Sequence, residues 1–595
     1  MENRRLYLIR LFVILFFALF ICQQAFSQPI TIDWEHNYGG TNYDQAHDAV
    51  MTVDSSFVSL NETYSDDFEV SVHYGVYSGD FWLTKINKFG ELVWEKSYGG
   101  SNSDIPQAIA ATSDGGFIIA GYTYSSDIDV TANHGGSDFW VVKIDILGNL
   151  EWERSIGGSS AEWAFSIIQT KDSNFVFTGW SSSLDGDIPE HLGSTDYNDL
   201  IVGKLDSLGN LLWIKVYGWL DDDEGADVTE TATGDLLICG TTVVEGEDGK
   251  DYYLLKLDAN GNFLWAKNYG GSGYDYAKAL IETPEKNIII TGECWSKDGD
   301  VDGHHGSDYS DMWTIMVDSI GNIVWQNSLG GSGADIGNDL IYCSDGSSVI
   351  SGITTSLNDG DVTGHIAPPL YSNQWLVKLD TKGIIKWTKC LGGTSGEYAN
   401  AILRQSDSIF VVFGDSRSND YDVSNHYFSD PVTPDVWIVK IYENCTQLQY
   451  YRDADADSYG NDLNYTYSCE AIEGYVLTTG DCNDLDDAIY PGATEVLNGL
   501  DDDCNGAIDN GLPVIDNPLT GFSIYPTPAH NQLQISNALG YPASFEITNL
   551  QGVIINQKQL FNANYSVDVS TLAAGIYLLN IYTGKGIVVF KFVKC

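Results

Sequence analysis

Three aspartates at alternating positions, Asp453, Asp455 and Asp457, are followed by Tyr459 and Gly460. This spacing turns three carboxylates and one backbone carbonyl toward a common point, as in the first half of a calcium-binding loop. Oxygen ligands of this kind suit a hard divalent cation. The pattern predicts a Ca²⁺ site whose ligands are the three carboxylates and the Tyr459 carbonyl.

Two further acidic clusters follow in the same stretch, residues 445–511. They are Asp481, Asn483, Asp484 and Asp486, and then Asp501, Asp503, Asn505 and Asp509. The last cluster repeats the spacing of the first, and the middle one is able to complete either ligand shell. The stretch holds 15 acidic residues and a single Arg, so its carboxylates repel one another unless cations neutralise them. We therefore expect at least two bound Ca²⁺ ions; the alternative, a solvated acidic linker, explains neither the spacing nor the cysteines.

The acidic stretch resembles the metal-binding motif of secreted bacterial proteins, which is related in style to thrombospondin type 3 and dockerin loops. The resemblance rests on Y-Y-R-D-A-D-A-D-S-Y-G, D-C-N-D, Y-P-G-A-T-E and N-G-L-D-D-D-C-N-G-A-I-D. Leu497 departs from it, because that pattern usually carries Cys at this position, and this leaves the disulfide pairing open. Cys445, Cys469, Cys482 and Cys504 allow three connectivities, of which spacing favours Cys445–Cys469 with Cys482–Cys504.

The rest of the chain is organised around a repeat of four strand-length apolar runs. Each repeat ends on a Trp, and successive copies are separated by 52 to 62 residues. The copies are Trp34, Trp94, Trp152, Trp213, Trp265, Trp325 and Trp387. Hairpin turns such as Asp114-Gly115-Gly116 and Leu147-Gly148-Asn149 separate the runs, since Gly accepts the positive φ of tight turns. Four strands per unit at this period predict an all-β fold, a seven-bladed β-propeller.

The phase of the repeat predicts how the ring closes. The repeats begin with a lone fourth strand, Thr31 to Asn37, and the last repeat supplies only three strands, ending with Val436–Ile441. If the N-terminal strand completes the last blade, both the extra strand at the start and the missing strand at the end are accounted for. No sheet edge is then left exposed. We expect these two strands to pair. Cys239, Cys294, Cys343 and Cys390 lie in or beside propeller strands and are expected to be buried thiols.

Two polar features recur on the propeller face that carries the long loops. An acid follows each Gly-Gly position by four residues, and an acid-x-acid motif followed by His lies between the second and third strands of six repeats. The first set is Asp44, Asp104, Glu162, Asp223, Asp275, Asp335 and Glu397. A ring of cation sites is one interpretation; the other, which we favour, is that these groups hydrogen-bond neighbouring loops and backbone, since features repeated in every blade report what every blade needs.

The repeats, residues 30–444, resemble the seven-bladed propeller repeats of secreted bacterial proteins. The shared motif runs G-G-S-x-x-D, T-x-D-G-G-F-I-I-A-G-x-T and D-x-W-x-V-K-x-D-x-x-G-N-x-x-W, and it implies an architecture without implying one activity.

The two ends of the chain carry export signals. Residues 1–27 combine Arg4, Arg5 and Arg10 with an apolar run and a small-x-small cleavage site, which predicts a secretory signal peptide. A lipoprotein modified at Cys22 is the alternative, although Ile21 is large for that signal. No later apolar run is long enough to span a bilayer, so no transmembrane segment is expected after signal removal.

Residues 520–595 follow a linker, 512–519, and alternate short strands with Gly turns, which favours a β-sandwich. The module resembles the C-terminal sorting domain of type IX secretion, from Y-P-x-P-A to K-F-V-K, with Thr527 in place of the usual Asn. The resemblance implies the type IX secretion machinery as a partner, and release from the cell or attachment to its outer surface. An ordinary adhesive β-sandwich is the alternative.

Net charge and the absence of common catalytic motifs argue against several classes of function. The formal charge of −54 repels nucleic acid and anionic lipid, so neither is an expected partner. No G-x-S-x-G, H-E-x-x-H or P-loop motif is present. The sequence therefore favours a secreted or cell-surface protein (domains 28–444, 445–511 and 520–595) that binds an extracellular ligand, a glycan or a protein, without catalysis. The alternative is a secreted polysaccharide hydrolase or lyase with its site at the propeller axis.

Overall fold

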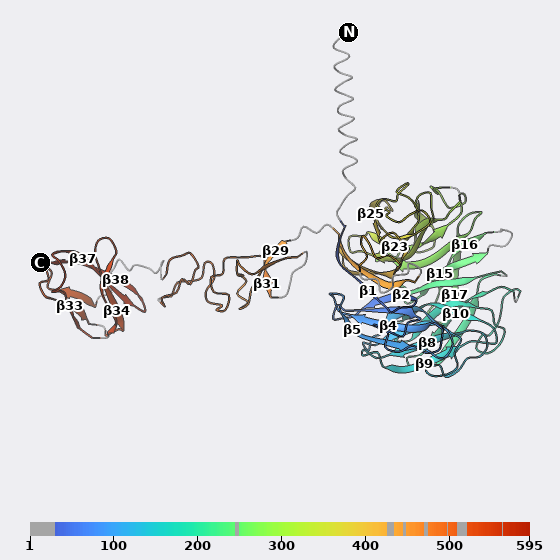
Figure 1. Cartoon of the computed structure of the whole chain (residues 1–595), viewed down its shortest axis with the longest axis horizontal. Coiled ribbons are helices and arrows are strands. Elements are labelled where there is room, and N and C mark those ends of the chain that lie inside the picture. The colour runs from blue at the N-terminus through green and yellow to red at the C-terminus, as the bar shows by residue number, and fades with distance from the viewer. Residues whose placement is uncertain are drawn as a thin grey trace, which may run out of the picture. The chain divides into compact units, whose positions relative to one another are not determined.

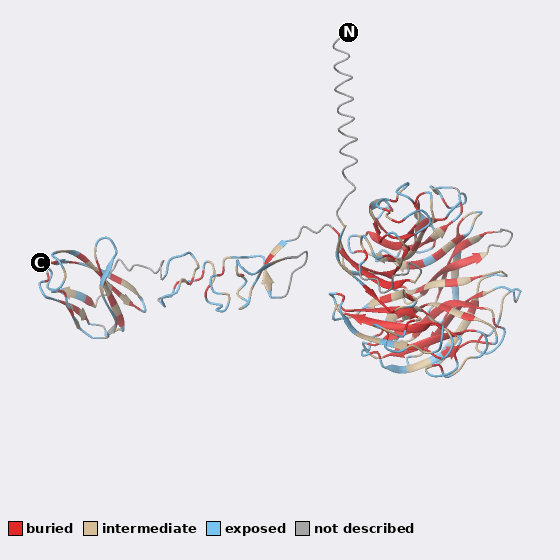
Figure 2. Ribbon diagram, viewed as in Figure 1, coloured by how far each residue is buried: buried red, intermediate tan, exposed pale blue. Residues whose placement is uncertain are grey.

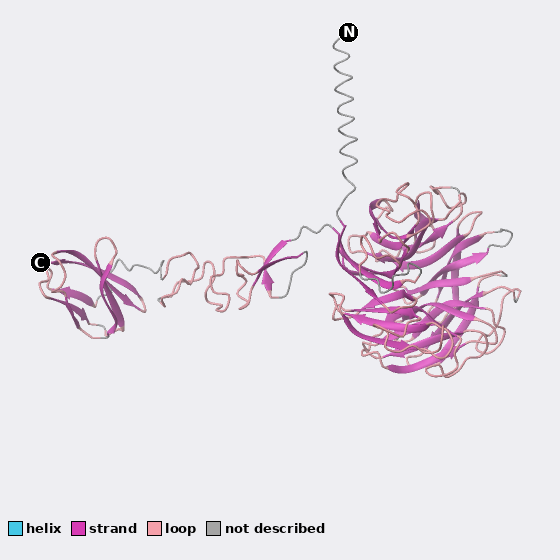
Figure 3. Cartoon of the chain, in the orientation of Figure 1, coloured by secondary structure: helices cyan, strands magenta, loops and turns pink. Residues whose placement is uncertain are grey.

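The computed structural model describes residues 30–595 except 195, 220, 244–248, 307, 425–432, 444–447, 469–473, 497, 509–520, 539 and 562. The chain divides into two compact units, Met1–Cys445 and Thr446–Cys595, which are taken separately below. All regular elements of the described residues are strands, so the expected all-β class is confirmed (Figure 3). The expected signal peptide, residues 1–27, lies outside the described residues.

The first unit contains seven four-stranded antiparallel sheets (Figure 1). The first three that are continuous in sequence are β2 (Asp44–Met51), β3 (Phe57–Thr63), β4 (Asp80–Ile86), β5 (Leu92–Tyr98); β6 (Asp104–Ala111), β7 (Phe117–Thr123), β8 (Asp138–Ile144), β9 (Leu150–Ile156); and β10 (Glu162–Gln169), β11 (Phe175–Ser181), β12 (Asp199–Leu205), β13 (Leu211–Tyr217). The next three are β14 (Glu224–Glu230), β15 (Leu236–Val243), β16 (Lys250–Leu257), β17 (Phe263–Tyr269); β18 (Asp275–Glu282), β19 (Ile288–Cys294), β20 (Asp311–Val317), β21 (Ile323–Leu329); and β22 (Asp335–Tyr342), β23 (Ser348–Thr354), β24 (Asn373–Leu379), β25 (Ile385–Leu391).

The seventh sheet joins the two ends of the repeat region, as the phase of the repeat predicts. It consists of β26 (Glu397–Ser406), β27 (Ile409–Ser416), β28 (Asp435–Glu443) and β1 (Ile30–Tyr38). β1 pairs antiparallel with β28, with Thr31 opposite Tyr442 and Asn37 opposite Trp437. The innermost strands β2, β6, β10, β14, β18, β22 and β26 contact one another in turn, and β26 contacts β2. The sheets therefore form a closed ring, a β-propeller with one sheet per blade.

Apolar packing between blades explains why the middle strands are continuous apolar runs. Every residue of β4, β8, β12 and β20 is buried, because both faces of each blade are covered by its neighbours (Figure 2). The largest fully buried side chains include one Trp of the third strand in five blades. They are Trp82, Trp140, Trp313, Trp375 and Trp437. The cysteines Cys239, Cys294, Cys343 and Cys390 are buried free thiols, as expected.

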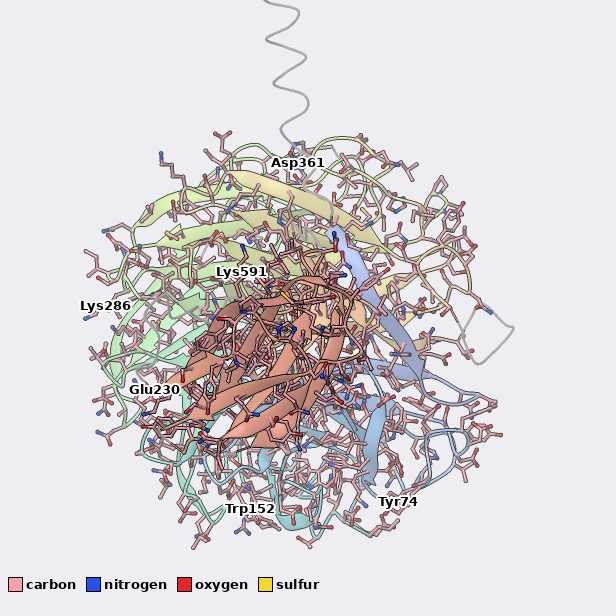
Figure 4. The ribbon with its side chains drawn as sticks, turned by 90° about the vertical axis from the view of Figure 1, so that its left-hand side faces the viewer. Tyr74, Trp152, Glu230, Lys286, Asp361 and Lys591 are labelled. Carbon is pink, nitrogen blue, oxygen red and sulfur yellow. A yellow bond between two sulfur atoms is a disulfide. The ribbon has the colours of Figure 1, made fainter. Side chains whose placement is uncertain are left out.

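The repeated fourth-strand Trp and the glycine turn of the next blade form one packing unit. Gly209, in the turn before β13, has φ +80°, and a Cβ there would lie 2.8 Å from Cε3 of Trp152 on β9, which Figure 4 labels. Gly148 contacts Trp94 and Gly261 contacts Trp213 in the same way. Only Gly combines this φ with this close approach, so Trp and Gly recur together at the repeat period.

The second unit contains three small sheets. β29 (Leu448–Arg452) pairs with β30 (Tyr465–Ser468) and β31 (Tyr475–Val476) in the acidic stretch. The C-terminal module has one sheet of β32 (Phe522–Tyr525), β33 (Gln532–Asn537) and β36 (Tyr565–Asp568), and another of β34 (Ala543–Thr548), β35 (Ile554–Phe561), β37 (Gly575–Thr583) and β38 (Gly586–Lys594). Buried Leu533, Phe545, Leu579 and Phe592 belong to one core that both sheets share, which confirms the expected sandwich.

Candidate metal centre

The first carboxylate cluster forms as the sequence predicts. Asp453, Asp455 and Asp457 each offer an oxygen, and these oxygens lie within 4.8 Å of one another. The chain curls around them because their carboxylates accept backbone N–H groups of the same loop: Ala456 donates to Asp453 (2.7 Å) and Tyr459 to Asp457 (2.8 Å). The loop thereby holds three anionic groups together, which is unfavourable unless a cation lies between them.

Two residues of the middle cluster approach the same point from the next loop. The chain passes from Gly460 to a bridge with Thr479, and the Asp481 N–H donates to the Gly460 carbonyl (3.3 Å). Asp484 accepts the N–H of Ala454 (2.8 Å) and so fixes its loop beside the first cluster. Asp481 is 6% exposed, and its Oδ2 has no hydrogen-bond partner among the described residues. A buried carboxylate oxygen without a donor is able to take up either a proton or a cation.

The electrostatics of the first cluster agree with this geometry. Burial raises the pKa of Asp481, and the charges of Asp457, Asp455 and Asp484 raise it further. Burial likewise raises the pKa of Asp457, together with the charges of Asp455, Asp453 and Asp484. The Oδ2 atoms of Asp455 and Asp457 are buried without partners as well. Asp481 and Asp484 therefore belong with the first cluster, which the sequence had left open.

Asp501 and Asp503 of the last predicted cluster gather with an acid that sequence reasoning missed, and these three form the second cluster. Glu495, Asp501 and Asp503 each place an oxygen within 4.8 Å of the others. Glu495 is 8% exposed; its Oε1 accepts the Asp503 N–H (3.3 Å), while its Oε2 is buried without a partner. Burial raises the pKa of Glu495, with the charges of Asp503 and Asp502 adding to it. The Glu of Y-P-G-A-T-E was the available signal, but it lies six residues before Asp501 and outside the alternating pattern.

The remaining predicted ligands either make hydrogen bonds within their own loops or lie outside the residues that the structure describes. The Oδ1 of Asn505 accepts the Ala507 N–H (3.0 Å), and the Oδ1 of Asp486 accepts the Ala488 N–H (3.4 Å). Asn483 contributes a backbone carbonyl to the Asp486 N–H (3.0 Å). Asp509 lies outside the described residues.

A disulfide links the two clusters. Cys482 and Cys504 are bonded, as spacing favoured, and they directly follow Asp481 and Asp503. One covalent bond thus joins the residue after Asp481 to the residue after Asp503, and so links the two clusters. Cys445 and Cys469 lie outside the described residues, so their pairing stays a prediction.

The donor set fits calcium by its chemistry. Both described clusters consist of carboxylate oxygens, which hard cations prefer, and neither includes a His or a thiolate. Soft or borderline metals such as copper and zinc favour nitrogen and sulfur ligands. A Ca²⁺ ion in each cluster would neutralise the repelling carboxylates and complete the ligand field of the buried oxygens.

The repeated acids of the propeller have a structural role. Gly100 donates its N–H to Oδ2 of Asp104 (2.6 Å), and Ser125 donates to the same oxygen (3.0 Å). The same backbone contact recurs in every blade. The acceptors are Asp44, Glu162, Asp223, Asp275, Asp335 and Glu397. These carboxylates hold the loop between blades, as the favoured interpretation expects.

Three carboxylates of the inner strands break the repeat, and sequence reasoning missed them. Asp48, Asp227 and Asp339 occupy the position after the bulge of β2, β14 and β22, where other blades carry Ala or Ser. Each accepts its own neighbour's N–H and that of the next blade; Ile402 donates to Asp339 and Ile109 to Asp48, both at 2.8 Å. Burial raises the pKa of Asp339 to about 8, and the charges of the other two add to it. They join blades at the axis.

Among the described residues, no helix has the length and apolar character needed to cross a membrane. Two family models match the second unit. One, described as "Secretion system C-terminal sorting domain", matches residues 523–595. The other, described as "Putative metal-binding motif", matches residues 481–510.

Similarity to whole proteins is remote. A WD repeat-containing protein of Acanthamoeba polyphaga mimivirus is 18% identical over 431 residues, which cover 56% of this chain and 31% of that protein. The Neurospora crassa Pan2 WD40 domain is 9% identical, covering 70% of this chain and 96% of that one, with a TM-score of 0.39. The β-propeller domain of the Trilobed protease from Pyrococcus furiosus is 10% identical, covering 63% and 90%, with a TM-score of 0.33.

The sorting domain assigns the chain to type IX secretion, so the protein is secreted or attached to the outer cell surface. The matched motif spans Asp481, the Cys482–Cys504 disulfide and the second carboxylate cluster. The two matched family models, a sorting domain and a metal-binding motif, thus agree with the resemblances found in the sequence.

Proposed function

We propose that this protein is a secreted or cell-surface binding protein that is handled by the type IX machinery, does no chemistry of its own, and carries a Ca²⁺-stabilised segment at residues 445–511. The proposed domains are a signal peptide (1–27), the propeller (28–444), the calcium segment, a linker (512–519) and the sorting sandwich (520–595). The ligand of the propeller is an extracellular glycan or protein.

One observation carries the calcium assignment: each carboxylate cluster includes a nearly fully buried acid with an oxygen that no donor among the described residues satisfies. The two acids are Asp481 in the first cluster and Glu495 in the second. Leaving such an oxygen unpaired is costly, and a bound cation removes the cost. The proposed ligands form two sets. They are Asp453, Asp455, Asp457, the Tyr459 carbonyl, Asp481 and Asp484 in the first, and Glu495, Asp501, Asp503, Asn505 and Asp509 in the second.

Calorimetric titration of the mature chain with Ca²⁺, Mg²⁺ and Cu²⁺ tests the assignment. We expect two Ca²⁺ ions with dissociation constants of roughly 10⁻⁴–10⁻³ M, the range of extracellular modules. Asp455→Asn should remove one ion, whereas the exposed Asp487→Asn, outside both clusters, should remove none. A preference for Cu²⁺, or no heat with Ca²⁺, would contradict it.

Binding is favoured over catalysis because the most prominent polar residues repeat in every blade and are engaged in backbone hydrogen bonds. The second candidate, a polysaccharide hydrolase or lyase, is favoured by the three unrepeated axial acids, Asp48, Asp227 and Asp339. A glycan array probed with the mature chain, with and without Ca²⁺, should show retention without cleavage. Cleavage of a polysaccharide that is lost in Asp339→Asn would favour the enzyme instead.

A further inference from the structure

The junctions between blades contain a second, unassigned set of carboxylates. At Gly99, Gly157, Gly270 and Gly392, a polar residue at the start of the third strand faces the repeated acid of the next blade across the first Gly of the Gly-Gly position. At Gly99, a Cβ would lie 2.6 Å from Oδ1 of Asp80 and 2.8 Å from Oδ2 of Asp104. The same arrangement holds at Gly157, between Asp138 and Glu162, where the two distances are 2.7 Å and 2.4 Å. Two buried carboxylates therefore point at one place.

In each of these two pairs, hydrogen bonds among the described residues account for every oxygen except one. Oδ2 of Asp80 accepts the Tyr74 N–H (2.5 Å; Tyr74 is labelled in Figure 4), while its Oδ1 is buried without a partner. Asp104 accepts from Gly100, Ser125 and Thr123. The unpartnered Oδ1 recurs at the same position of other blades. The further cases are Asp138, Asp199 and Asp311, and all four of these aspartates are 0–1% exposed.

The sixth junction has a hydrogen-bond donor at the position where Asp80 and its equivalents have the unpartnered Oδ1. Asn373 replaces the aspartate there, and its Oδ1 accepts the Ile366 N–H (2.8 Å), the role of Oδ2 elsewhere. Its Nδ2 occupies the place of the unpartnered Oδ1 and donates to Oε2 of Glu397 (2.8 Å). A Cβ at Gly392 would lie 2.7 Å from this Nδ2 and 2.3 Å from the Glu397 oxygen, as at the other junctions. An amide N–H thus fills the position with a donor.

From this isosteric replacement we infer that the junctions of Asp80, Asp138, Asp199 and Asp311 each bind one proton, held between Oδ1 of that aspartate and the acid of the next blade. A protonated carboxyl offers the same donor as the Asn373 amide in the same place, and it removes one of two negative charges that would otherwise repel inside the ring. A metal cation is the competing occupant, but an amide N–H cannot replace one.

The ionisation tendencies support the geometry. Burial raises the pKa of Asp80 to about 8, with Asp104 and Asp129 adding to it, and burial raises the pKa of Asp104 to about 6. The other titratable groups near this pair are His73, whose Nε2 lies 3.8 Å from Asp80, and Asp127, Asp129, Tyr64 and Tyr74. Near the sixth junction they are Asp415, Arg417 and His365.

The sign of the pH effect follows from the raised pKa values. In the unfolded chain these carboxyls ionise near pH 4, whereas in the folded chain the pairs keep a proton to higher pH. Their contribution to stability is therefore complete below about pH 4 and is lost as the pH rises through 6 to 8. The propeller should unfold more readily at pH 9 than at pH 5 for this reason.

Two opposite substitutions test the inference in the mature chain. Asp80→Asn copies the sixth junction into the first, and Asn373→Asp copies the first into the sixth. All 16 Trp lie between Trp34 and Trp437, so Trp fluorescence follows unfolding of the propeller without the calcium segment. Denaturation is measured at pH 5 and pH 9, with EDTA and with Ca²⁺. Infrared spectra at pH 7 count protonated carboxyls.

We expect Asn373→Asp to be close to wild type at pH 5 and to raise the unfolding constant at pH 9 by about tenfold or more, since each pKa unit is a factor of ten. Asp80→Asn should reduce the wild-type difference between pH 5 and pH 9 and remove one protonated carboxyl from the infrared spectrum. If Asn373→Asp does not fold, Asp80→Asn alone still decides. Equal effects at both pH values, an unchanged carboxyl signal, or a Ca²⁺ dependence gained by Asn373→Asp and lost by Asp80→Asn would overturn the inference.

Discussion

At the scale of single residues, hydrogen-bond partners distinguish the roles of chemically identical carboxylates. Asp104 accepts a backbone N–H and two hydroxyls, so each of its oxygens already has a donor within the protein. Asp481 keeps one buried oxygen without a donor beside three other acids. The first arrangement builds the propeller, and the second suits a cation.

Glu495 offers the sharpest substitution, because its Oε2 is buried without a partner while its neighbours are more exposed. Glu495→Gln should keep the hydrogen bond to the Asp503 N–H and weaken Ca²⁺ binding at the second cluster by roughly tenfold or more. Titration calorimetry should show the first site unchanged. Equal weakening at both sites would point to misfolding of the segment.

Calcium binding should weaken as the pH falls. The pKa values of Asp457 and Asp481 are raised by burial and by neighbouring charges, so protons compete with Ca²⁺ at higher pH than for ordinary aspartates. Without Ca²⁺ these two groups stabilise the segment most below about pH 4 and lose that effect as the pH rises. Stabilisation by Ca²⁺ should therefore be larger at pH 7 than at pH 5, as measured by protease protection. A larger effect at pH 5 would contradict this.

The sequence predicted which carboxylates gather best where they alternate along the chain. Asp453, Asp455 and Asp457 come together because their loop is local. Glu495 joins Asp501 through the return of the chain, which spacing alone does not reveal. The special roles of Asp48 and Asn373 become visible only when the blades are compared position by position. Each differs from the residue that several other blades carry at the same position.

At the scale of elements, the register of the strands and one disulfide fix the geometry. β1 pairs with β28 along its whole length, so the ring is closed by residues some 400 positions apart. The phase of the repeat alone predicted this pairing. The repeat region begins with a strand that has no blade of its own and ends with a blade that lacks one strand, so the first strand completes the last blade. The bulge in each first strand was not predicted, since it depends on contacts between inner strands.

Removal of β1 should destabilise the whole ring. Without residues 28–40, β28 becomes an exposed edge and the last blade loses an apolar face with partly buried Ile30 and Ile32. Trp fluorescence should report a lower melting temperature in one cooperative transition. A variant lacking residues 28–40 that melts at the wild-type temperature would rule out closure by this strand.

The disulfide should couple the two proposed calcium sites. Cys482→Ser removes the bond to Cys504, so the loop that carries Asp481 is no longer joined covalently to the loop that carries Asp503. We expect both affinities to fall, and the double variant with Cys504→Ser to behave like the single one. The matched comparison is Cys343→Ser in the propeller, which should leave Ca²⁺ titration unchanged. Loss at one site only would show that the bond does not couple them.

At the scale of the whole molecule, the sorting domain and the net charge both suit a protein that acts outside the cell. The sorting domain directs the chain to the outside, and a negative charge of −54 suits an environment that supplies divalent cations. Composition and repeats predicted the order of the parts along the chain. They did not identify the propeller's ligand, because binding surfaces depend on how unlike residues of different blades meet.

Processing should remove the sorting domain. If residues 520–595 act only as a sorting signal, protein from the native host should end near residues 512–520, with the propeller folded. Mass spectrometry of the extracellular protein measures the end directly. An extracellular form that retains Cys595 would count against removal.

Limited proteolysis of the mature chain, with and without millimolar Ca²⁺, tests the central claim most directly. We predict that Ca²⁺ protects residues 445–511 from cleavage and that EDTA restores cleavage, because binding and folding of this segment are coupled. Asp455→Asn should lose protection of the first loop, and Asp487→Asn should keep it. Cleavage at the same rate with and without Ca²⁺ would contradict the account and leave the segment a solvated acidic linker.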